Sequence, residues 1–350
     1  MTLPKILTIF CGGTISMHKG DSGSLEVAYG PDQFFRLEPR MAELAQIDVC
    51  DLINIDSSNI RVEHWDQILE VIETRYNEYD GFLVTIGTNT MAYTASALSF
   101  ALQHIGKPVV MTGAQIPAEA INTDGRNNLV NAFRLAGMNV RGVYVVFGSK
   151  IMLGCRSKKL SESELDAFGS FNDVDFAEIN IGIKFNKDIP ERHTNPPQIM
   201  RGFNPNILCL TCIPGIEAKP IVRDLIDRGY KGIIMRGYGS ADISEDMLPD
   251  IKYAQEKKVP IVVTTQCRGS TVMGINDPGF KALQAGVVQA FDMSMESMST
   301  KMMWLLAQNT PYESFKKAFH TNMCGEINIK KSKFFINKEL ASLSEYRDVL

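Results

Sequence analysis

The chain has 350 residues, of which 45% are hydrophobic and 22% are charged, a balance typical of a globular protein with room for about two domains. Its formal net charge of -4 at pH 7 gives it no overall basic character for binding phosphates, so we expect no nucleic acid partner. No apolar run reaches the roughly 18 residues that a membrane-spanning helix needs, so we expect no membrane association.

Short apolar runs rich in β-branched residues recur along the chain and predict buried strands. We expect strands at residues 5–11, 81–86, 107–113, 142–148, 207–213, 232–237, 259–265 and 286–291. These runs are too continuously apolar for strands with one solvated face, which favours parallel strands joined by crossover helices. Apolar residues at helical spacing in Glu63–Tyr79 and Met298–Leu306 indicate helix faces that pack on the core. The fold class is therefore α/β.

Two threonines stand just past glycines at the ends of the first two runs. Thr14 follows Gly12 and Gly13, and Thr88 follows Gly87. Side chains at the carboxyl ends of parallel strands project into the crevice where α/β proteins bind ligands, so we expect the two hydroxyls to meet over one substrate. This arrangement indicates nucleophilic catalysis, although a helix N-cap role explains a single threonine here, Thr88 or Thr90, about equally well.

The glycine-rich turn before Thr14 lacks the third glycine of a dinucleotide fingerprint and the lysine of a P-loop, so it does not favour a nucleotide ligand. Residues 18–31 follow it, with three glycines and few large apolar side chains. A mobile lid over the crevice and a static surface loop explain this stretch equally well.

A threonine hydroxyl needs a base before it can attack a carbonyl carbon. The histidines stand in no recognisable triad or metal-ligand spacing, so we expect neither a histidine base nor a metal site: His18, His64, His104, His193 and His320. Lys159, which follows the fourth predicted strand, is the alternative base. Partial burial lowers the pKa of a lysine amine from about 10.4 and makes its neutral form accessible.

The polar stretch 186–205 contains four prolines and interrupts both periodicities. We therefore predict an N-terminal domain at 1–190, a linker at 191–206 and a C-terminal domain at 207–350. Cys209 and Cys212 form a single C-x-x-C pair inside a strand-like run, which favours neither zinc nor a redox role. The seven cysteines are scattered and odd in number, which suits a reducing compartment and predicts a cytoplasmic protein.

Nine segments, among them Gly12-Gly13-Thr14-Ile15 and Gly87-Thr88-Asn89-Thr90-Met91, together resemble the bacterial-type L-asparaginase family, in particular its cytosolic type I branch. They run from about residue 5 to 310 in the family's order: 12–15, 56–58, 87–91, 110–115, 124–129, 154–159, 236–239, 265–267 and 292–296. The resemblance implies a doubly wound, mainly parallel N-terminal domain, a smaller α/β C-terminal domain, and a homodimer or homotetramer whose active sites are completed by the neighbouring subunit. It also implies hydrolysis of L-asparagine to L-aspartate and ammonia through a threonine acyl-enzyme, with no cofactor.

On the family's pattern, Thr14 attacks the amide carbon, and Thr88 with Lys159 activates a hydroxyl or a water molecule. Ser57 and Ser58 hold the α-carboxylate of the substrate. The resemblance also places Asn89 and Glu296 among the residues that bind the substrate.

Two positions depart from this pattern. Asn89 stands where the family has an aspartate that accepts the substrate's α-ammonium, and Ser24 stands where a lid tyrosine is usual, with Tyr29 the nearest tyrosine. An ion pair at about 4 Å is worth up to roughly 4 kcal/mol at an effective dielectric near 20, and an amide oxygen recovers only part of that. We therefore expect free asparagine to bind more weakly here. Two alternatives stay open: a hydrolase for an asparagine derivative or other amide with an altered α-amino group, and a non-catalytic amino-acid-binding relative.

Overall fold

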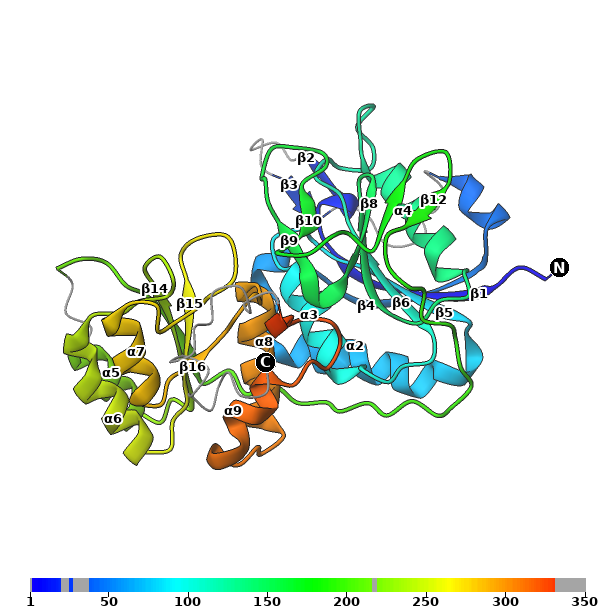
Figure 1. Ribbon diagram of the computed structural model, residues 1–350. Helices are drawn as coiled ribbons and strands as arrows, with labels where there is room; N and C mark the ends of the chain where they lie inside the picture. Colours follow the sequence, from blue (N-terminus) through cyan, green and yellow to red (C-terminus); the bar gives the residue numbers. More distant parts are fainter. Residues whose placement is uncertain (1, 20–24, 28–37, 216–218, 331–350) are drawn as a thin grey trace. The chain divides into compact units, whose positions relative to one another are not determined.

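The computed structural model describes residues 2–19, 25–27, 38–215 and 219–330, and the chain divides into two compact units (Figure 1). The first unit is Met1–Arg201 and the second is Gly202–Leu350. The division falls inside the stretch 191–206 that we predict as a linker; the exact bounds of that linker stay a prediction.

An eight-stranded sheet forms the centre of the first unit, in the order β12-β11-β8-β7-β6-β5-β1-β4. In chain order its strands are β1 (Lys5–Gly12), β4 (Gln46–Ile55), β5 (Gly81–Thr85), β6 (Pro108–Thr112), β7 (Gly142–Phe147), β8 (Lys150–Leu153), β11 (Ala177–Ile179) and β12 (Ile183–Phe185). The five strands from β4 to β7 in this order are parallel, and the others are antiparallel. All four strands predicted in this half are confirmed.

The prediction missed β4, because its side chains do not form a continuous apolar run. Among the strands that the structure describes, β4 lies at the edge of the sheet and pairs only with β1. Polar residues such as Asp48 and Asp51 alternate with partly buried apolar ones along it. An edge strand tolerates this pattern, since one of its two hydrogen-bonding edges has no neighbouring strand and its side chains are less enclosed.

Helices cover both faces of this sheet, as in a doubly wound fold. On one face, Phe133 of α4 (Gly125–Ala136) belongs to a buried cluster with Ile6 and Leu83 of the strands. On the other face, Phe82 of β5 stacks on Tyr76 at the end of α2 (Val62–Arg75). The helix α3 (Met91–Ala101) is buried along nearly its whole length. The core face predicted for Glu63–Tyr79 is confirmed, since all of its apolar anchors are buried: Trp65, Ile68, Leu69, Ile72, Tyr76 and Tyr79.

Short elements complete the first unit. Two antiparallel pairs are β2 (Met17–Lys19) with β3 (Leu25–Val27), and β9 (Ser157–Lys159) with β10 (Phe168–Ser170). Single 3-10 turns are η1 (Thr14–Ser16), η2 (Pro39–Glu43), η3 (Ser57–Asn59), η4 (Tyr76–Glu78) and η5 (Gly154–Arg156). Three of these turns, η1, η3 and η5, follow strand ends and carry or precede predicted site residues.

The second unit is smaller and has a parallel sheet of four strands. The order is β13 (Ile207–Thr211), β14 (Gly232–Gly237), β15 (Ile261–Thr265) and β16 (Val288–Gln289). Its helices are α5 (Lys219–Asp227), α6 (Leu248–Glu256), α7 (Asp277–Gln284), α8 (Met295–Ala307) and α9 (Tyr312–His320), with the 3-10 turn η6 (Glu245–Met247). All four predicted strands are confirmed, and the predicted apolar stripe lies on α8, where Met298 and Met302 are buried.

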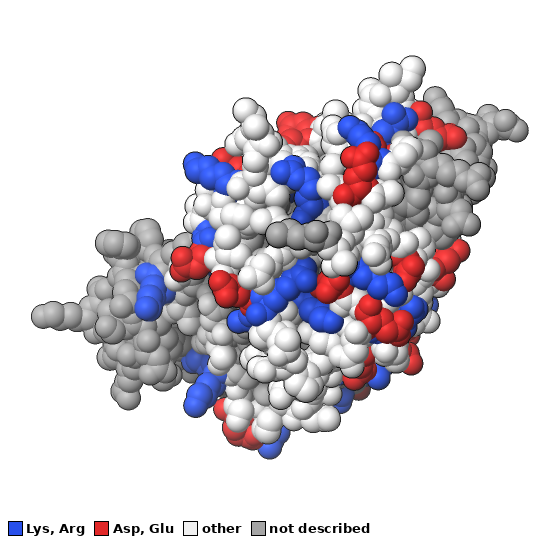
Figure 2. Space-filling model, turned by 90° about the vertical axis from the view of Figure 1, so that its right-hand side faces the viewer, with Lys and Arg blue, Asp and Glu red and all other residues white. Residues whose placement is uncertain are grey.

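Among the helices of the described ranges, none is long and apolar enough to cross a membrane. All seven cysteines are free thiols. On the face shown in Figure 2, lysine and arginine side chains are interspersed with acidic ones over the coloured residues, as the nearly balanced composition leads one to expect.

Candidate active site

The two glycine turns that precede Thr14 and Thr88 touch through their backbones. β1 and β5 are parallel neighbours in which Phe10 pairs with Thr85, so both strands end at the same edge of the sheet. Gly13 has a φ of +94°, and a Cβ on it would lie 2.4 Å from the backbone nitrogen of Gly87. Only glycine fits such a close approach in this conformation. The turns are therefore packed together, and they bring both threonines to the same end of adjacent strands.

The hydroxyl of Thr88 lies between an amine and an amide. Lys159 Nζ donates a hydrogen bond to Thr88 Oγ1 at 2.8 Å, and Thr88 Oγ1 donates to Gln115 Oε1 at 3.1 Å. Thr88 is only 6% exposed, so both contacts are largely shielded from water. A buried hydroxyl in contact with a lysine amine is suited to proton transfer, because a neutral amine can take its proton.

The N-cap explanation holds for neither threonine side chain. Thr90 occupies the N-cap position of α3, but its hydroxyl makes no capping bond and donates to the backbone oxygen of Ser57 at 2.8 Å. The hydroxyl of Thr88 is engaged by Lys159 and Gln115 instead. The second threonine turn is thus tied to the turn η3 and to the lysine, and not to the start of the helix.

Lys159 reaches Thr88 because its segment packs closely against α3, the helix that follows Thr88. A Cβ on Gly154, at the start of η5, would lie 2.6 Å from Ser99 Oγ and 2.9 Å from the backbone oxygen of Ala95. The glycine lets η5 lie directly on the helix, and β9 then carries Lys159 to the end of the sheet. Residues 71 positions apart in the chain are brought into contact in this way.

The environment of Lys159 favours its neutral form. Burial lowers the pKa of this amine below its ordinary value, and the charge of Glu162 opposes the shift only in part. Among the described residues, no carboxylate lies within ion-pair distance of Nζ; its second contact is a hydrogen bond of 3.2 Å to Asn89 Oδ1. Lys159 can therefore act as a base more readily than an exposed lysine.

Asn89 connects this lysine to the serine turn after β4. Asn89 Nδ2 donates to Ser58 Oγ at 3.2 Å, while Asp56 caps the turn by accepting from the backbone nitrogen of Ser58 at 2.7 Å. Asn89 and Ser58 are exposed, whereas Ser57 is only 2% exposed and packs against Gly87. Of the two predicted serines, Ser58 is thus the one whose hydroxyl is open to a ligand.

Gln115 belongs to this network, although the sequence pattern alone did not single it out. Its amide oxygen accepts from Thr88, and its amide nitrogen donates to the backbone oxygens of Glu162 and Glu164 at 3.0 and 3.4 Å. The available signal was its position at the end of the 110–115 segment, directly after the strand next to β5. Gln115 fixes the orientation of the Thr88 hydroxyl.

A buried carboxylate holds the loop that carries Gln115. Asp124 is 9% exposed and accepts from the backbone nitrogens of Gln115 and Ile116 at 3.0 Å each. It also accepts from Asn128 Nδ2 at 3.0 Å, and that amide in turn donates to the backbone oxygen of Gly113 at 3.0 Å. Through these hydrogen bonds the 124–129 segment positions the 113–116 loop. None of these bonds involves a residue of the two threonine turns.

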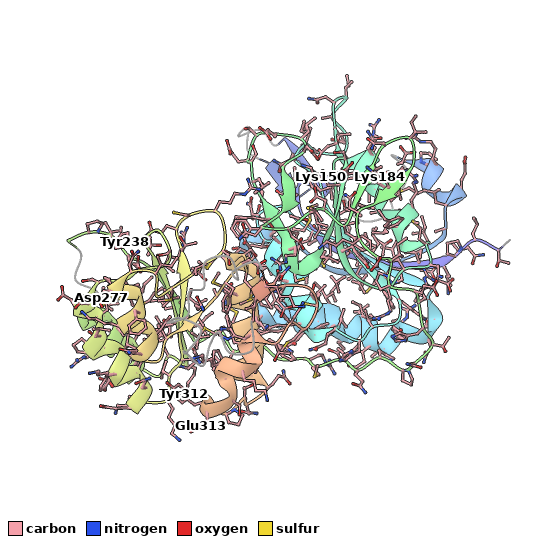
Figure 3. All side chains as sticks on the ribbon, in the orientation of Figure 1. Lys150, Lys184, Tyr238, Asp277, Tyr312 and Glu313 are labelled. Carbon is pink, nitrogen blue, oxygen red and sulfur yellow. The ribbon has the colours of Figure 1, made fainter. Side chains whose placement is uncertain are left out.

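An ion pair supports the other side of the Gln115 network. Lys150, labelled in Figure 3, pairs with Asp166 at 2.9 Å. Asp166 also accepts from the backbone nitrogen of Ser149 at 3.2 Å. These bonds anchor the end of the segment whose carbonyl groups hold the Gln115 amide.

The other predicted site residues are placed as follows. Thr14 is the partly exposed first residue of η1. Glu296 lies in the first turn of α8 in the second unit and is 8% exposed. The lid candidates Ser24 and Tyr29 lie outside the described residues. Of the 18–31 stretch, the structure describes only the ends of a short hairpin, β2 and β3.

Two of the described histidines, His64 and His320, have side-chain contacts away from these residues. His64 Nδ1 accepts from the backbone nitrogen of Arg61, and the ring of His320 bonds the backbone oxygen of Gln289. Within the described ranges, no group of three or more His, Cys, Asp or Glu residues is placed to hold a metal ion.

Comparison with known families gives two matches that together cover most of the chain. The family model "Asparaginase, N-terminal" matches residues 5–191, and "Glutaminase/Asparaginase C-terminal domain" matches residues 206–319.

Similar proteins include asparaginases and one component of an amidotransferase. An L-asparaginase of Thermococcus kodakarensis is 34% identical over 328 residues, covering 92% of this chain and 99% of that protein. L-asparaginase 1 of Escherichia coli is 34% identical over 335 residues, covering 93% and 99%. A glutamyl-tRNA(Gln) amidotransferase subunit of Pyrococcus abyssi is 34% identical over 338 residues, covering 93% and 77%.

Solved structures agree with these matches. The thermostable L-asparaginase from Thermococcus kodakarensis superimposes with a TM-score of 0.84 at 33% identity and covers 93% of this chain and 99% of its own. L-asparaginase I from Vibrio cholerae gives a TM-score of 0.84 at 32% identity and covers 93% and 100%.

Proposed function

The chain belongs to the asparaginase family of amidohydrolases, and we propose that it hydrolyses the side-chain amide of L-asparagine or a close analogue through a threonine acyl-enzyme. The observation that carries this proposal is the 2.8 Å contact between Lys159 Nζ and Thr88 Oγ1, next to the turn that carries Thr14. An amine in contact with one hydroxyl, beside the turn that carries the second, supports a site at this end of the sheet where a substrate carbonyl can meet all three groups.

In the first half of the reaction, the Thr14 hydroxyl attacks the amide carbon. Its proton passes to neutral Lys159, directly or through the Thr88 hydroxyl, and the tetrahedral intermediate forms. When the C–N bond breaks, the leaving nitrogen takes up a proton and departs as ammonia, which leaves an ester between Thr14 and the acyl group. This ester is the acyl-enzyme.

In the second half, water cleaves the ester. Thr88 and Lys159 take a proton from the attacking water, the C–O bond to Thr14 breaks, and the Thr14 oxygen recovers a proton. A carboxylic acid leaves, and the enzyme returns to its starting state. Gln115 keeps the Thr88 oxygen turned toward Lys159 in both halves.

The exposed hydroxyl of Ser58 is suited to hold the α-carboxylate of the substrate, with Ser57 shaping the turn behind it. Asn89 lies between this hydroxyl and Lys159. A short amino acid amide would thus span from Ser58 at its carboxylate end to Thr88 at its amide end.

The proposal extends to assembly and location. We expect a homodimer or homotetramer in which a neighbouring copy contributes to each active site, with Glu296 among the substrate-binding residues. Light scattering of the purified chain tests the oligomer size. Seven free cysteines support a reducing compartment and hence a cytoplasmic protein.

A second candidate function is ammonia supply to a partner protein. It is favoured by the 34% identity to the glutamyl-tRNA(Gln) amidotransferase component over the same part of the chain that matches the asparaginases. The hydrolytic steps would be the same, but ammonia would pass to an acceptor on the partner. Steady ammonia release by the purified chain alone favours the first candidate, whereas hydrolysis that requires an added partner favours the second.

Substitution of the three proposed catalytic residues tests the first candidate. Ammonia release should fall by at least about 100-fold in Thr14→Ala, Thr88→Ala and Lys159→Met, because each removes a nucleophile or a proton-transfer group. Thr74→Ala, an exposed threonine on α2, is the matched control and should leave the rate unchanged. Full activity in Thr14→Ala would overturn the acyl-enzyme mechanism.

A further inference from the structure

Four side chains form one continuous chain of contacts in the candidate active site: Thr88, Lys159, Asn89 and Ser58. These four side chains include one potential cation, Lys159, and no carboxylate. We propose, as a refinement that rests on the proposed amidohydrolase function, that the site selects anionic ω-amides without an α-ammonium group, such as succinamate or an N-acylated asparagine, over zwitterionic asparagine.

The orientation of the Asn89 amide follows from its two neighbours. Its oxygen accepts from Lys159 Nζ at 3.2 Å, and its nitrogen donates to Ser58 Oγ at 3.2 Å. The reverse orientation would set N–H donors against the donors of a protonated amine, so the lysine fixes the amide as observed. With the Ser58 oxygen accepting from Asn89, the Ser58 O–H remains free to donate to a carboxylate.

Asn89 faces the part of the substrate that carries the α-substituent. The amide carbon of a substrate must lie near Thr88 and Lys159 for reaction, and its carboxylate lies near the Ser58 hydroxyl. Asn89 contacts both Lys159 and Ser58, so the carbon between these two ends lies beside it. Asn89 is exposed, which leaves it accessible to that carbon's substituent.

Among the described residues of the first unit, no carboxylate contacts the side chains of Lys159, Asn89 and Ser58, so this unit offers an α-ammonium group no anion there. When Lys159 is protonated, the ammonium would meet a like charge with only a neutral amide between them. When Lys159 is neutral, the ammonium would give up water for a single amide oxygen that Lys159 already shares. An anionic substrate avoids both costs, because its carboxylate binds near Ser58 and its α-substituent carries no charge.

Within the described part of the first unit, the carboxylates of Asp56 and Glu162 lie near these residues, but neither contacts the Asn89 side chain. Asp56 Oδ1 accepts from the backbone nitrogen of Ser58 at 2.7 Å as the cap of that turn. The negative charge of Glu162 partly opposes the lowering of the Lys159 pKa, but in the described part of the chain the Glu162 carboxylate forms no ion pair with Lys159 Nζ. Asn89 is thus the residue where a carboxylate would reverse the preference.

The test compares kcat/KM for L-asparagine, N-acetyl-L-asparagine and succinamate, measured as ammonia release by the full-length chain. We expect the better of the two anionic amides to exceed L-asparagine by at least tenfold. In Asn89→Asp, the ratio should shift at least tenfold toward L-asparagine. Asn195→Asp makes the same chemical change at an exposed linker position and should leave the ratio unchanged.

A wild-type preference below tenfold, or a shift below tenfold in Asn89→Asp, would overturn the selectivity while leaving the amidohydrolase function intact. If Asn89→Asp does not fold, as judged by circular dichroism, the wild-type ratio decides alone. Absence of ammonia release from all three amides would overturn the proposed function itself, and with it this refinement.

Discussion

Restoring a carboxylate at position 89 should raise the pKa of Lys159 and shift the pH dependence of hydrolysis. In Asn89→Asp, a carboxylate oxygen would take the place of an amide oxygen 3.2 Å from Lys159 Nζ. At that separation, Coulomb's law gives about 5 kcal/mol for an effective dielectric near 20. Because Asn89 is exposed, solvent screening reduces this to about 1–3 kcal/mol, which corresponds to about one to two pKa units.

The assay is the pH profile of kcat/KM for whichever amide the wild type turns over best. Lys159 must be neutral to act as a base, so activity should rise with pH through its pKa. The acid limb of the Asn89→Asp profile should lie about one to two pH units higher than that of the wild type. The profile of Asn195→Asp should coincide with the wild type. An acid limb that stays in place or moves to lower pH in Asn89→Asp would refute the assignment of Lys159 as the base.

Three further predictions concern positioning and stability. Gln115→Leu should lower kcat about tenfold with little change in KM, since Thr88 loses its acceptor; an unchanged kcat would contradict this. Gly13→Ala should cost about 3 kcal/mol or more in the free energy of unfolding, measured in urea, because its Cβ would lie 2.4 Å from Gly87; wild-type stability would show that the turns separate easily. Burial lowers the pKa of His320 to about 4, so stability present above pH 6.5 should fall by up to about 3 kcal/mol as pH drops toward 4. His320→Gln should show a smaller decline over that window, and an equal decline would place the effect elsewhere.

The strands and core helices could be predicted from sequence because their signals are local. Continuous apolar runs marked the buried parallel strands, and helical spacing marked the core face of α2. The edge strand β4 gave no such signal, because the exposed Asp48 and Asp51 interrupt its apolar residues. Local periodicity in the sequence indicates which side chains a segment buries. An edge strand buries fewer side chains, so its signal is weaker.

Candidate site residues with reactive side chains could be predicted from the sequence. Residues whose role depends on contacts with distant parts of the chain could not be predicted as well. The glycine turns and Lys159 pointed to one crevice. Gln115 did not stand out, since an amide side chain gains importance only through the neighbours that it meets, here Thr88 and two carbonyl groups. The difference between buried Ser57 and exposed Ser58 likewise follows from the close packing of η3 against Gly87, which no local pattern reveals.

The most direct test of the mechanism is intact-mass and peptide-mapping mass spectrometry of the enzyme, acid-quenched during turnover of a slow amide substrate. An acyl adduct, equal in mass to the substrate less ammonia, should map to Thr14 and be absent from Thr14→Ala. An adduct on Thr88 or any other residue, or unchanged hydrolysis by Thr14→Ala, would contradict the assignment of Thr14 as the nucleophile.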